Sequence, residues 1–417
     1  MKKYDEYKDS GVAWIGKVPK HWEVIPFKRA MTIYNGSDYK HIQVEIAGYP
    51  VIGSGGEFAR ASQYVYDGEV VLLGRKGTID KPMYYNGKFW TVDTMFYAIP
   101  KKHVNCKYLY YQALIIPFER YATSTALPSM TQTDLNLNII SLPSTVEQVA
   151  IADYLDTHCA KIDNLISIQQ KRIALLQELK QSVITYAVTK GLNPNVEMKQ
   201  SGVEWIGDVP KHWEVCKLKH YSQVFGRIGF RGYNQTDLVN EGEGAITLSP
   251  SNMQNGILNY DKCSYLSWKK YYESPEIMIY NDDVLFVKTG STYGKISYVA
   301  DLPMEATINP QIVVFKNIKG NNKYLYYLLS NDIVQMQVSL TVGGSTIPTL
   351  SQESILNYIV PLAPKVEQAA IASYLDHKCA TIDTSISNAQ HQIELLQEYK
   401  QSLITEVVTG KRKVTEN

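Results

Sequence analysis

The chain of 417 residues is long enough for two to three domains, and its apolar fraction of 45% is sufficient for ordinary cores. The formal net charge of +1 excludes a global basic field, so any site for a polyanion must be a local patch. No apolar run approaches the roughly 18 residues of a membrane span. Five cysteines without a CxxC pair are typical of a reduced, cytoplasmic protein.

A tryptophan-rich box occurs twice in the chain. Residues 10–24 read SGVAWIGKVPKHWEV and residues 201–215 read SGVEWIGDVPKHWEV, with thirteen of fifteen positions identical. We expect Trp14 and Trp22 to be packing anchors. His21 and His212 have no second ligand nearby in the sequence, so we predict no metal site in either box.

Module 1, defined here as residues 25–143, has the texture of a β-rich domain. Short runs such as Val70–Leu73 and Phe96–Ile99 are separated by Gly, Asn and Asp turns. A helix is predicted over Lys107–Tyr121. It is followed by a polar loop (residues 122–135, ATSTALPSMTQTDL) and by a last strand at Asn138–Leu142.

Module 2, residues 216–364, follows the same plan on a different sequence. The strand run recurs at Val284–Val287, and a second polar loop reads VGGSTIPTLSQESIL at residues 342–356. Pro348 stands at the place of Pro128, and Gln352 at that of Gln132. The two modules differ in sequence, while the boxes and long helical stretches beside them are nearly identical. This pattern favours two different binding specificities on one scaffold. Structural duplication with drifting loops would leave the same pattern.

Each module leads into a stretch of more than forty residues that lacks Pro and Gly, and the two stretches match at an offset of 220 residues. Ser144 and Glu147 form a capping box at the start of the first. Apolar residues recur at alternating steps of four and three, which is a heptad seam. The predicted seam residues are Leu155, Ile162, Ile166, Ile173, Leu176 and Val183, and their copies Leu375, Ile382, Ile386, Ile393, Leu396 and Leu403.

One such helix cannot bury its apolar stripe alone, whereas two copies can bury it against each other. We therefore predict a two-helix coiled coil rather than two ordinary core helices, with Lys180 and Lys400 as matched polar interruptions. Connectivity favours an antiparallel pair, which brings Lys411 to the same end as Met1.

The predicted fold class is α+β, with two mixed α/β domains separated by a long antiparallel two-helix coiled coil and related by an internal pseudo-two-fold repeat. We assign residues 1–143 and 192–364 to the two domains, each with its box. Residues 144–191 and 365–417 are the two helical regions.

Catalytic motifs are absent from the sequence. GSTYGKI at Gly290 is one residue short of a phosphate loop, and no Ser or Thr follows Lys295. There is no HExxH, no GxSxG, and no tetrapeptide typical of amino-group methylation. We therefore expect a binding protein with no catalytic residue, metal or cofactor of its own.

The residues that we expect to contact nucleic acid lie mainly in two Gly-flanked basic turns that follow equivalent strands, residues 74–78 and 287–295. Glycine lets backbone N–H groups approach phosphates, and Arg or Lys can neutralise phosphates or read guanine. For any single residue, an ordinary solvated turn is the competing explanation. The candidates are Arg60, Arg75, Lys76, Thr78, Ser124 and Thr125 in the first domain, and Arg227, Arg231, Lys288, Thr289, Ser291, Thr292, Tyr293, Lys295, Ser345 and Thr346 in the second.

The repeated box, the helix start EQVAIADYLD at residue 147, the IELLQEYKQSLI stretch and the VTGK end together resemble the specificity (S) subunit of type I restriction–modification systems. The likeness covers the whole chain. The first helix departs only slightly, ending VTKG. The resemblance implies that two target-recognition domains each read half of a bipartite site in double-stranded DNA.

The resemblance also implies the partners. The two helical regions would set the spacing of the half-sites and dock modification (methyltransferase) subunits, and restriction subunits would join through the complex. S-adenosylmethionine and ATP would be bound by those partners and not by this chain. The alternatives are a coiled-coil scaffold that joins two protein-binding modules without DNA, and an enzyme with an unfamiliar site.

Overall fold

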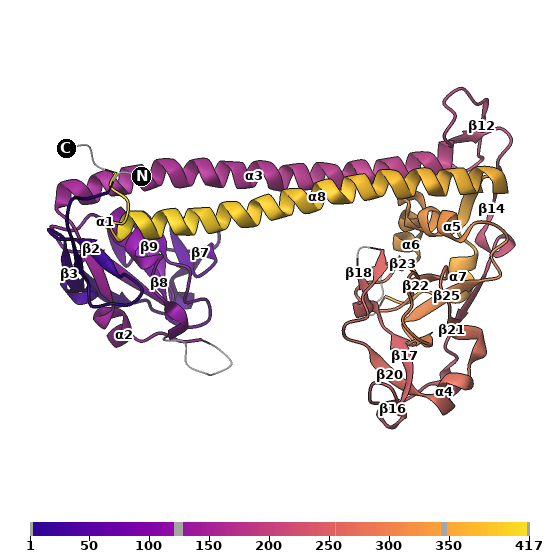
Figure 1. Cartoon of the computed structure of the whole chain (residues 1–417), viewed down its shortest axis with the longest axis horizontal. Coiled ribbons are helices and arrows are strands. Elements are labelled where there is room, and N and C mark those ends of the chain that lie inside the picture. Colours follow the sequence, from indigo (N-terminus) through magenta and orange to yellow (C-terminus); the bar gives the residue numbers. More distant parts are fainter. Residues whose placement is uncertain (1–2, 121–127, 255, 343–347, 415–417) are drawn as a thin grey trace. The chain divides into compact units, whose positions relative to one another are not determined.

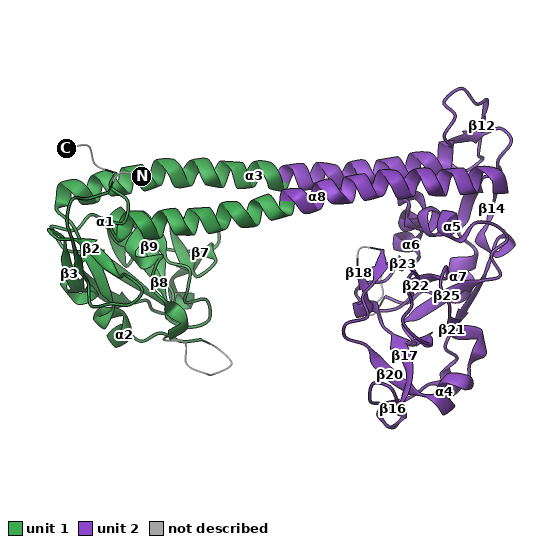
Figure 2. Ribbon diagram, in the orientation of Figure 1, with its two compact units in different colours: residues 1–170, 390–417 green, residues 171–389 purple. Residues whose placement is uncertain are grey.

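The computed structural model describes residues 3–120, 128–254, 256–342 and 348–414 (Figure 1). The chain divides into two compact units (Figure 2). Unit 1 contains residues 1–170 and 390–417, and unit 2 contains residues 171–389. Each unit therefore joins one module to half of each long helix.

A seven-stranded sheet forms the centre of module 1. Its order is β4-β10-β8-β9-β6-β7-β5, and neighbours are antiparallel except for β6 with β9. The predicted runs Val70–Leu73 and Phe96–Ile99 lie in β8 and β10, which confirms both strands. The bounds are β4 Met31–Asn35, β5 Gln43–Val44, β6 Tyr49–Gly53, β7 Gly56–Ala61, β8 Tyr66–Gly74, β9 Met83–Thr91 and β10 Met95–Pro100.

The other elements of unit 1 include a helix that is shorter than predicted. Helix α1 spans Cys106–Ala113 and not Lys107–Tyr121. Pro117 lacks an N–H donor and disfavours the helical conformation of the residue before it, so the helix cannot continue. The remaining bounds are β1 Tyr7–Asp9, β2 Lys17–Pro19, β3 Glu23–Pro26, η1 Phe27–Arg29, η2 Lys40–Ile42, η3 Phe118–Arg120, α2 Gln132–Leu137 and β11 Ile139–Leu142.

Module 2 has two main sheets instead of one. A four-stranded sheet has the order β15-β25-β22-β23, and a five-stranded sheet has the order β16-β20-β17-β24-β21. The strands of the first are β15 Gln223–Gly226, β22 Val284–Val287, β23 Ile296–Tyr298 and β25 Ile312–Lys316. Those of the second are β16 Leu238–Val239, β17 Gly244–Leu248, β20 Ser264–Ser267, β21 Met278–Ile279 and β24 Ala306–Ile308.

Unit 2 also contains three strand pairs outside these sheets: β12 with β13, β14 with β26, and β18 with β19. Their bounds are β12 Met198–Gln200, β13 Asp208–Pro210, β14 Glu214–Lys217, β18 Met253–Gln254, β19 Ile257–Leu258 and β26 Ile359–Leu362. The helices of module 2 are α4 Trp268–Tyr272, α5 Asn322–Ser330, α6 Asp332–Val342 and α7 Gln352–Leu356, with 3-10 turns η4 Leu218–His220, η5 Gly229–Arg231, η6 Gln235–Asp237, η7 Pro250–Asn252 and η8 Pro275–Ile277.

The two long helices are α3 (Thr145–Lys190) and α8 (Lys365–Val408), close to the predicted regions. Ser144 accepts a hydrogen bond from the Glu147 backbone N–H at 3.3 Å, as its predicted capping role requires. Gly191 and Gly410 follow the helices with φ of +77° and +73°. Glycine adopts this left-handed conformation without the steric cost of a Cβ atom, so it is a favourable C-terminal cap for both helices.

The helices are antiparallel within each unit, as predicted. In unit 1, Lys400 binds Asp163 at 2.7 Å; in unit 2, Lys180 binds Asp383 at 2.7 Å. The two lysines that interrupt the seam therefore each pair with an aspartate of the other helix. All twelve predicted seam residues are buried or half-buried. The Tyr7 hydroxyl donates to the Gly410 carbonyl at 3.1 Å, which ties the start of the chain to the end of α8, although Met1 itself lies outside the described residues.

Candidate nucleic-acid interface

The repeated box holds each module on the start of a long helix. In unit 1, His21 Nε2 lies 3.1 Å from a Glu147 carboxylate oxygen. In unit 2, Trp213 Nε1–H donates to Glu367 at 3.0 Å, and His212 Nε2 lies 2.5 Å from the same carboxylate. The histidines are therefore structural partners of the helix starts.

Only the second tryptophan of each box is a core anchor. Trp22 and Trp213 are fully buried. Trp14 is half-buried beneath the Arg120 guanidinium, 4.8 Å from its ring, and its copy Trp205 is 45% exposed. Trp14 therefore packs against Arg120 near the surface, whereas Trp22 packs within the core.

A second repeated contact joins α1 of module 1 and α5 of module 2 each to a long helix. The Tyr111 hydroxyl donates to Asp156 at 2.8 Å, and the Tyr327 hydroxyl donates to Asp376 at 2.7 Å. Burial, followed by the hydrogen bond to Asp156, raises the pKa of Tyr111. Sequence reasoning missed these pairs, although the recurrence of KYLYY and YLD at similar offsets carries the signal.

The basic turn of module 1 is bound to its polar loop by backbone hydrogen bonds. Lys76 and Ser129 form an antiparallel bridge. The Gly77 N–H donates to the Pro128 carbonyl at 2.9 Å, and Met130 N–H donates to the Arg75 carbonyl at 2.9 Å. Two segments that are more than fifty residues apart in the sequence are thus one structural unit.

The basic turn of module 2 makes the same contacts at the equivalent positions. Thr289 and Thr349 form the bridge. The Gly290 N–H donates to the Pro348 carbonyl at 3.1 Å, and Leu350 N–H donates to the Lys288 carbonyl at 2.8 Å. Gly290 has a φ of +103°, which favours glycine at this position. The structure therefore brings together, in both modules, the turn and loop that the sequence analysis singled out.

The side chains of the two turns are available to a ligand to different degrees. Arg75 is half-buried, with its guanidinium 5.8 Å from the Phe96 ring and a hydrogen bond to the Asp93 carbonyl at 3.2 Å. Ser124, Thr125, Ser345 and Thr346 lie outside the described residues. Among the other turn candidates, Lys76, Ser291 and Thr292 are exposed, and Thr78, Lys288, Thr289, Tyr293 and Lys295 are half-buried.

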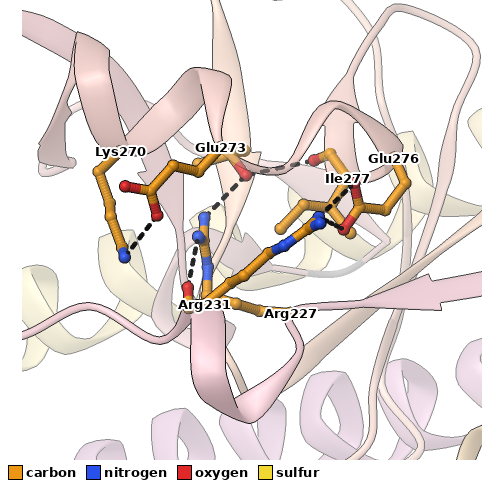
Figure 3. Close-up of polar contacts among 7 residues, drawn as sticks. Arg227, Arg231, Lys270, Glu273, Glu276 and Ile277 are labelled. Carbon is orange, nitrogen blue, oxygen red and sulfur yellow. Dashed lines mark hydrogen bonds and ion pairs between the residues drawn. The ribbon is translucent and has the colours of Figure 1, made fainter.

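Three candidate arginines lie outside the turns and have intramolecular partners. Arg60 is exposed, forms an ion pair with Glu57 at 3.0 Å and donates to the Gly48 carbonyl at 3.0 Å. Arg231 forms an ion pair with Glu276 at 3.3 Å (Figure 3). Both therefore have a carboxylate that a phosphate would have to displace.

Arg227 is 5% exposed, and its guanidinium is used inside module 2. It donates to the Thr307 hydroxyl at 3.1 Å. It also donates to the Arg231 carbonyl at 3.4 Å (Figure 3). Burial lowers its pKa below the usual arginine value. The Arg227 guanidinium is thus bonded within module 2, partly to the loop that carries Arg231.

The long helices carry exposed apolar side chains away from their seam. In unit 1, Leu395 and Tyr399 are 49% and 52% exposed, and they line an open groove of about 340 Å³ together with Leu165 and Gln169. The copies in unit 2, Leu175 and Leu179, are 65% and 50% exposed. Apolar surface of this kind marks an interaction site more often than an isolated exposed leucine does.

No cluster of three or more His, Cys, Asp or Glu residues in the described ranges is arranged to hold a metal ion. Within those same ranges, no helix is long and apolar enough to span a membrane.

Comparisons with known proteins agree on one family. A family model for the type I restriction modification DNA specificity domain matches residues 18–177 and 210–395. The type I restriction enzyme MjaVIII specificity subunit of Methanocaldococcus jannaschii is 24% identical over 352 residues, covering 82% of this chain and 76% of that protein. The putative MjaX specificity subunit of the same organism is 25% identical over 438 residues, covering 96% of each chain.

One solved structure supports the fold independently. It comes from a study of complex assembly and conformational transition in the type I R-M system, and it has a TM-score of 0.69 at 13% identity. The match covers 94% of this chain and 98% of that one. At this identity the likeness concerns the fold alone.

Proposed function

Because the chain belongs to the type I restriction–modification DNA specificity family, we propose that its two modules each read one half of a bipartite DNA site. We retain residues 1–143 and 192–364 as the two target-recognition domains. Membership of this family makes the chain a recognition subunit rather than an enzyme, and it favours DNA recognition over a scaffold for protein partners.

One observation carries the assignment of the reading surfaces. Both modules build the same paired unit of basic turn and polar loop, although their sheets differ and their sequences there differ. A backbone fixed by several hydrogen bonds presents its side chains at low entropic cost, as base reading requires. Different side chains on the same backbone, Lys76 in one module and Thr289 in the other, would then give different half-targets.

We assign direct DNA contacts to the turn residues first. Lys76, Ser291 and Thr292 are exposed and can approach a groove or a phosphate without rearrangement. Arg60 and Arg231 would contact phosphates only by exchanging their carboxylate partners. Arg227 is proposed as a support residue, because its guanidinium is buried and bonded to the Arg231 carbonyl.

The exposed apolar surface of the helices is the proposed docking site for modification subunits. Its residues recur in both copies of the frame, Leu175 with Leu395 and Leu179 with Tyr399, so that two copies of one partner can bind in the same way. Leu395→Asp should abolish co-purification with the modification subunit, whereas Ser402→Asp, also at an exposed site, should not. Retention of the complex by Leu395→Asp would exclude this surface.

The remaining partners are proposed from the family. Restriction subunits would join through the complex, and S-adenosylmethionine and ATP would bind to the partner subunits. The cytoplasm is the proposed place of action, in line with the cysteine content.

A gel-shift titration tests DNA binding itself. Phosphate contacts release counterions, so the affinity for random duplex DNA should fall steeply as salt rises. A binding curve that is independent of salt, or no binding at all, would favour the scaffold. Methylome sequencing of cells that carry this chain with its modification subunit then gives the target, and we expect two short motifs separated by a gap of fixed length.

A further inference from the structure

The amide of Gln132 closes the far end of the polar loop in module 1. Gln132 is the first residue of α2, three positions after Ser129, and its Nε2–H donates to the Ile33 carbonyl at 2.8 Å. Ile33 lies in β4, the edge strand of the seven-stranded sheet. Edge strands have carbonyl groups without a partner strand, and the Gln132 amide donates a hydrogen bond to one of them.

Gln352 does the same in module 2. It is the first residue of α7, three positions after Thr349. With its amide nitrogen turned toward the Val224 carbonyl, it donates at 3.0 Å and its oxygen accepts from the Gly226 N–H at 3.2 Å. Val224 and Gly226 lie in β15, the edge strand of the four-stranded sheet. The close approach is possible because Gly226 has no Cβ atom, which would lie 2.9 Å from the side-chain amide of Gln352.

The segment between turn and amide is therefore fixed at both ends in each module. Residues 128–132 are held by the bridge to Lys76 at one end and by the Gln132 amide at the other, with Met130 buried between them. Residues 348–352 are held in the same way, with Leu350 buried. The glutamine has been kept in two modules whose sheets have different architectures, so it serves the segment and not one particular sheet.

We propose that Gln132 and Gln352 are positioning residues for half-site recognition. Each would lock the polar segment beside its basic turn, so that the exposed side chains of the pair meet the bases in one fixed arrangement. Neither glutamine needs to touch DNA. This inference rests on the proposed function, since it names what sets the geometry of each reading surface.

Methionine substitutions test the proposal, because methionine keeps the length of glutamine and removes its amide. The complete complex with the modification subunit would be titrated on duplexes that carry single-base changes in either half-site. Gln352→Met should weaken binding roughly threefold to tenfold, the range expected for the loss of a hydrogen bond. It should also flatten the base preference in the module 2 half-site only. Gln132→Met should act on the other half-site, and more weakly, because Gln132 makes one of these bonds and Gln352 makes two.

Gln181→Met is the matched control, since it removes an amide bond to the Ser330 carbonyl at 2.8 Å, elsewhere in unit 2. Both substitutions should lower the unfolding midpoint, while only Gln352→Met should change base preference. A Gln352→Met complex with unchanged base preference, or with both half-sites altered equally, would overturn the positioning role and leave the proposed function standing. A wild-type complex without a bipartite preference would overturn both.

Discussion

At the scale of single residues, the same turn position carries Arg75 in module 1 and Lys288 in module 2. We predict that Arg75→Ala and Lys288→Ala each weaken DNA binding through their own module. A base-reading side chain should cost roughly 1–3 kcal/mol and relax one base position, whereas a phosphate contact should weaken all sequences alike and reduce the salt slope. Binding titrations on matched and mismatched duplexes at several salt concentrations separate the two. Unchanged affinity and slope in both variants would show that the turns do not face DNA.

Tyr111 provides a prediction on pH. Burial, followed by the hydrogen bond to Asp156, raises its pKa above the value of about 10 in the unfolded chain. The unfolded chain then loses this proton first as pH rises, so the free energy of unfolding should decrease above about pH 10. Below that pH the stabilising contribution is fully present.

Tyr111→Phe should lower the free energy of unfolding at pH 7.5 by roughly 1.5–3 kcal/mol, as expected for a hydrogen bond to a charged group. It should also make the alkaline decrease shallower. Urea unfolding at pH 7.5 and 10.5 measures both, with Tyr34→Phe at an exposed tyrosine as the control. An alkaline decrease as steep as that of the wild type would show that Tyr111 does not contribute to the loss of stability above about pH 10.

Contacts between residues close in the sequence could be predicted, whereas the burial of individual side chains could not. The capping role of Ser144 is readable because its partner lies three positions away. The sequence marks Arg227 as a candidate DNA contact but does not reveal that its guanidinium is buried and bonded to Thr307 and the Arg231 carbonyl. Trp14 and Trp22 occupy one box, and only the fold separates the half-buried ring from the core anchor.

At the scale of elements, the two crossed ion pairs define the register of the long helices. Lys400–Asp163 and Lys180–Asp383 both join residues whose numbers sum to 563. Their side chains are partly exposed, from 25% to 56%, so each pair should contribute no more than about 1 kcal/mol. The contribution of these pairs is therefore chiefly to register and orientation.

Lys400→Asp should destabilise unit 1, because it replaces attraction to Asp163 by repulsion. The double variant with Asp163→Lys should recover most of the loss, since it restores an opposite pair at the same crossing. Chemical unfolding of the four members of this cycle measures the coupling, with Lys180–Asp383 as the untouched internal reference. Additive effects of the two substitutions would mean that Lys400 and Asp163 do not interact favourably in solution.

Sequence periodicity predicted the long elements well because a heptad seam is repeated many times over. Shorter elements depend on single residues, as the early end of α1 before Pro117 shows. The two-sheet arrangement of module 2 could not be predicted, because its strands are only two to five residues long and pair across distant segments. The paired turn and polar loop were recognisable as recurring segments, but their mutual hydrogen bonds were not.

At the scale of the whole molecule, the helices are proposed to set the distance between the half-sites. Inserting one heptad after Gln169 and another after Ala389 keeps the seam in phase and lengthens each helix by about 10 Å, at roughly 1.5 Å per residue. We predict unchanged half-sites and a gap longer by about three base pairs, at roughly 3.4 Å per pair. The methylated motif in cells that supply the modification subunit is the readout. An unchanged gap would mean that the helices do not act as the spacer.

The central claim is that each module reads its half-site independently. The most direct test exchanges residues 25–143 for the corresponding module of another member of the family and sequences the methylome of cells that supply the modification subunit. The box, α3, α8 and module 2 remain as they are. We predict that one half of the methylated motif changes, while the other half and the length of the gap stay the same. A motif in which both halves change together would contradict independent reading by two modules.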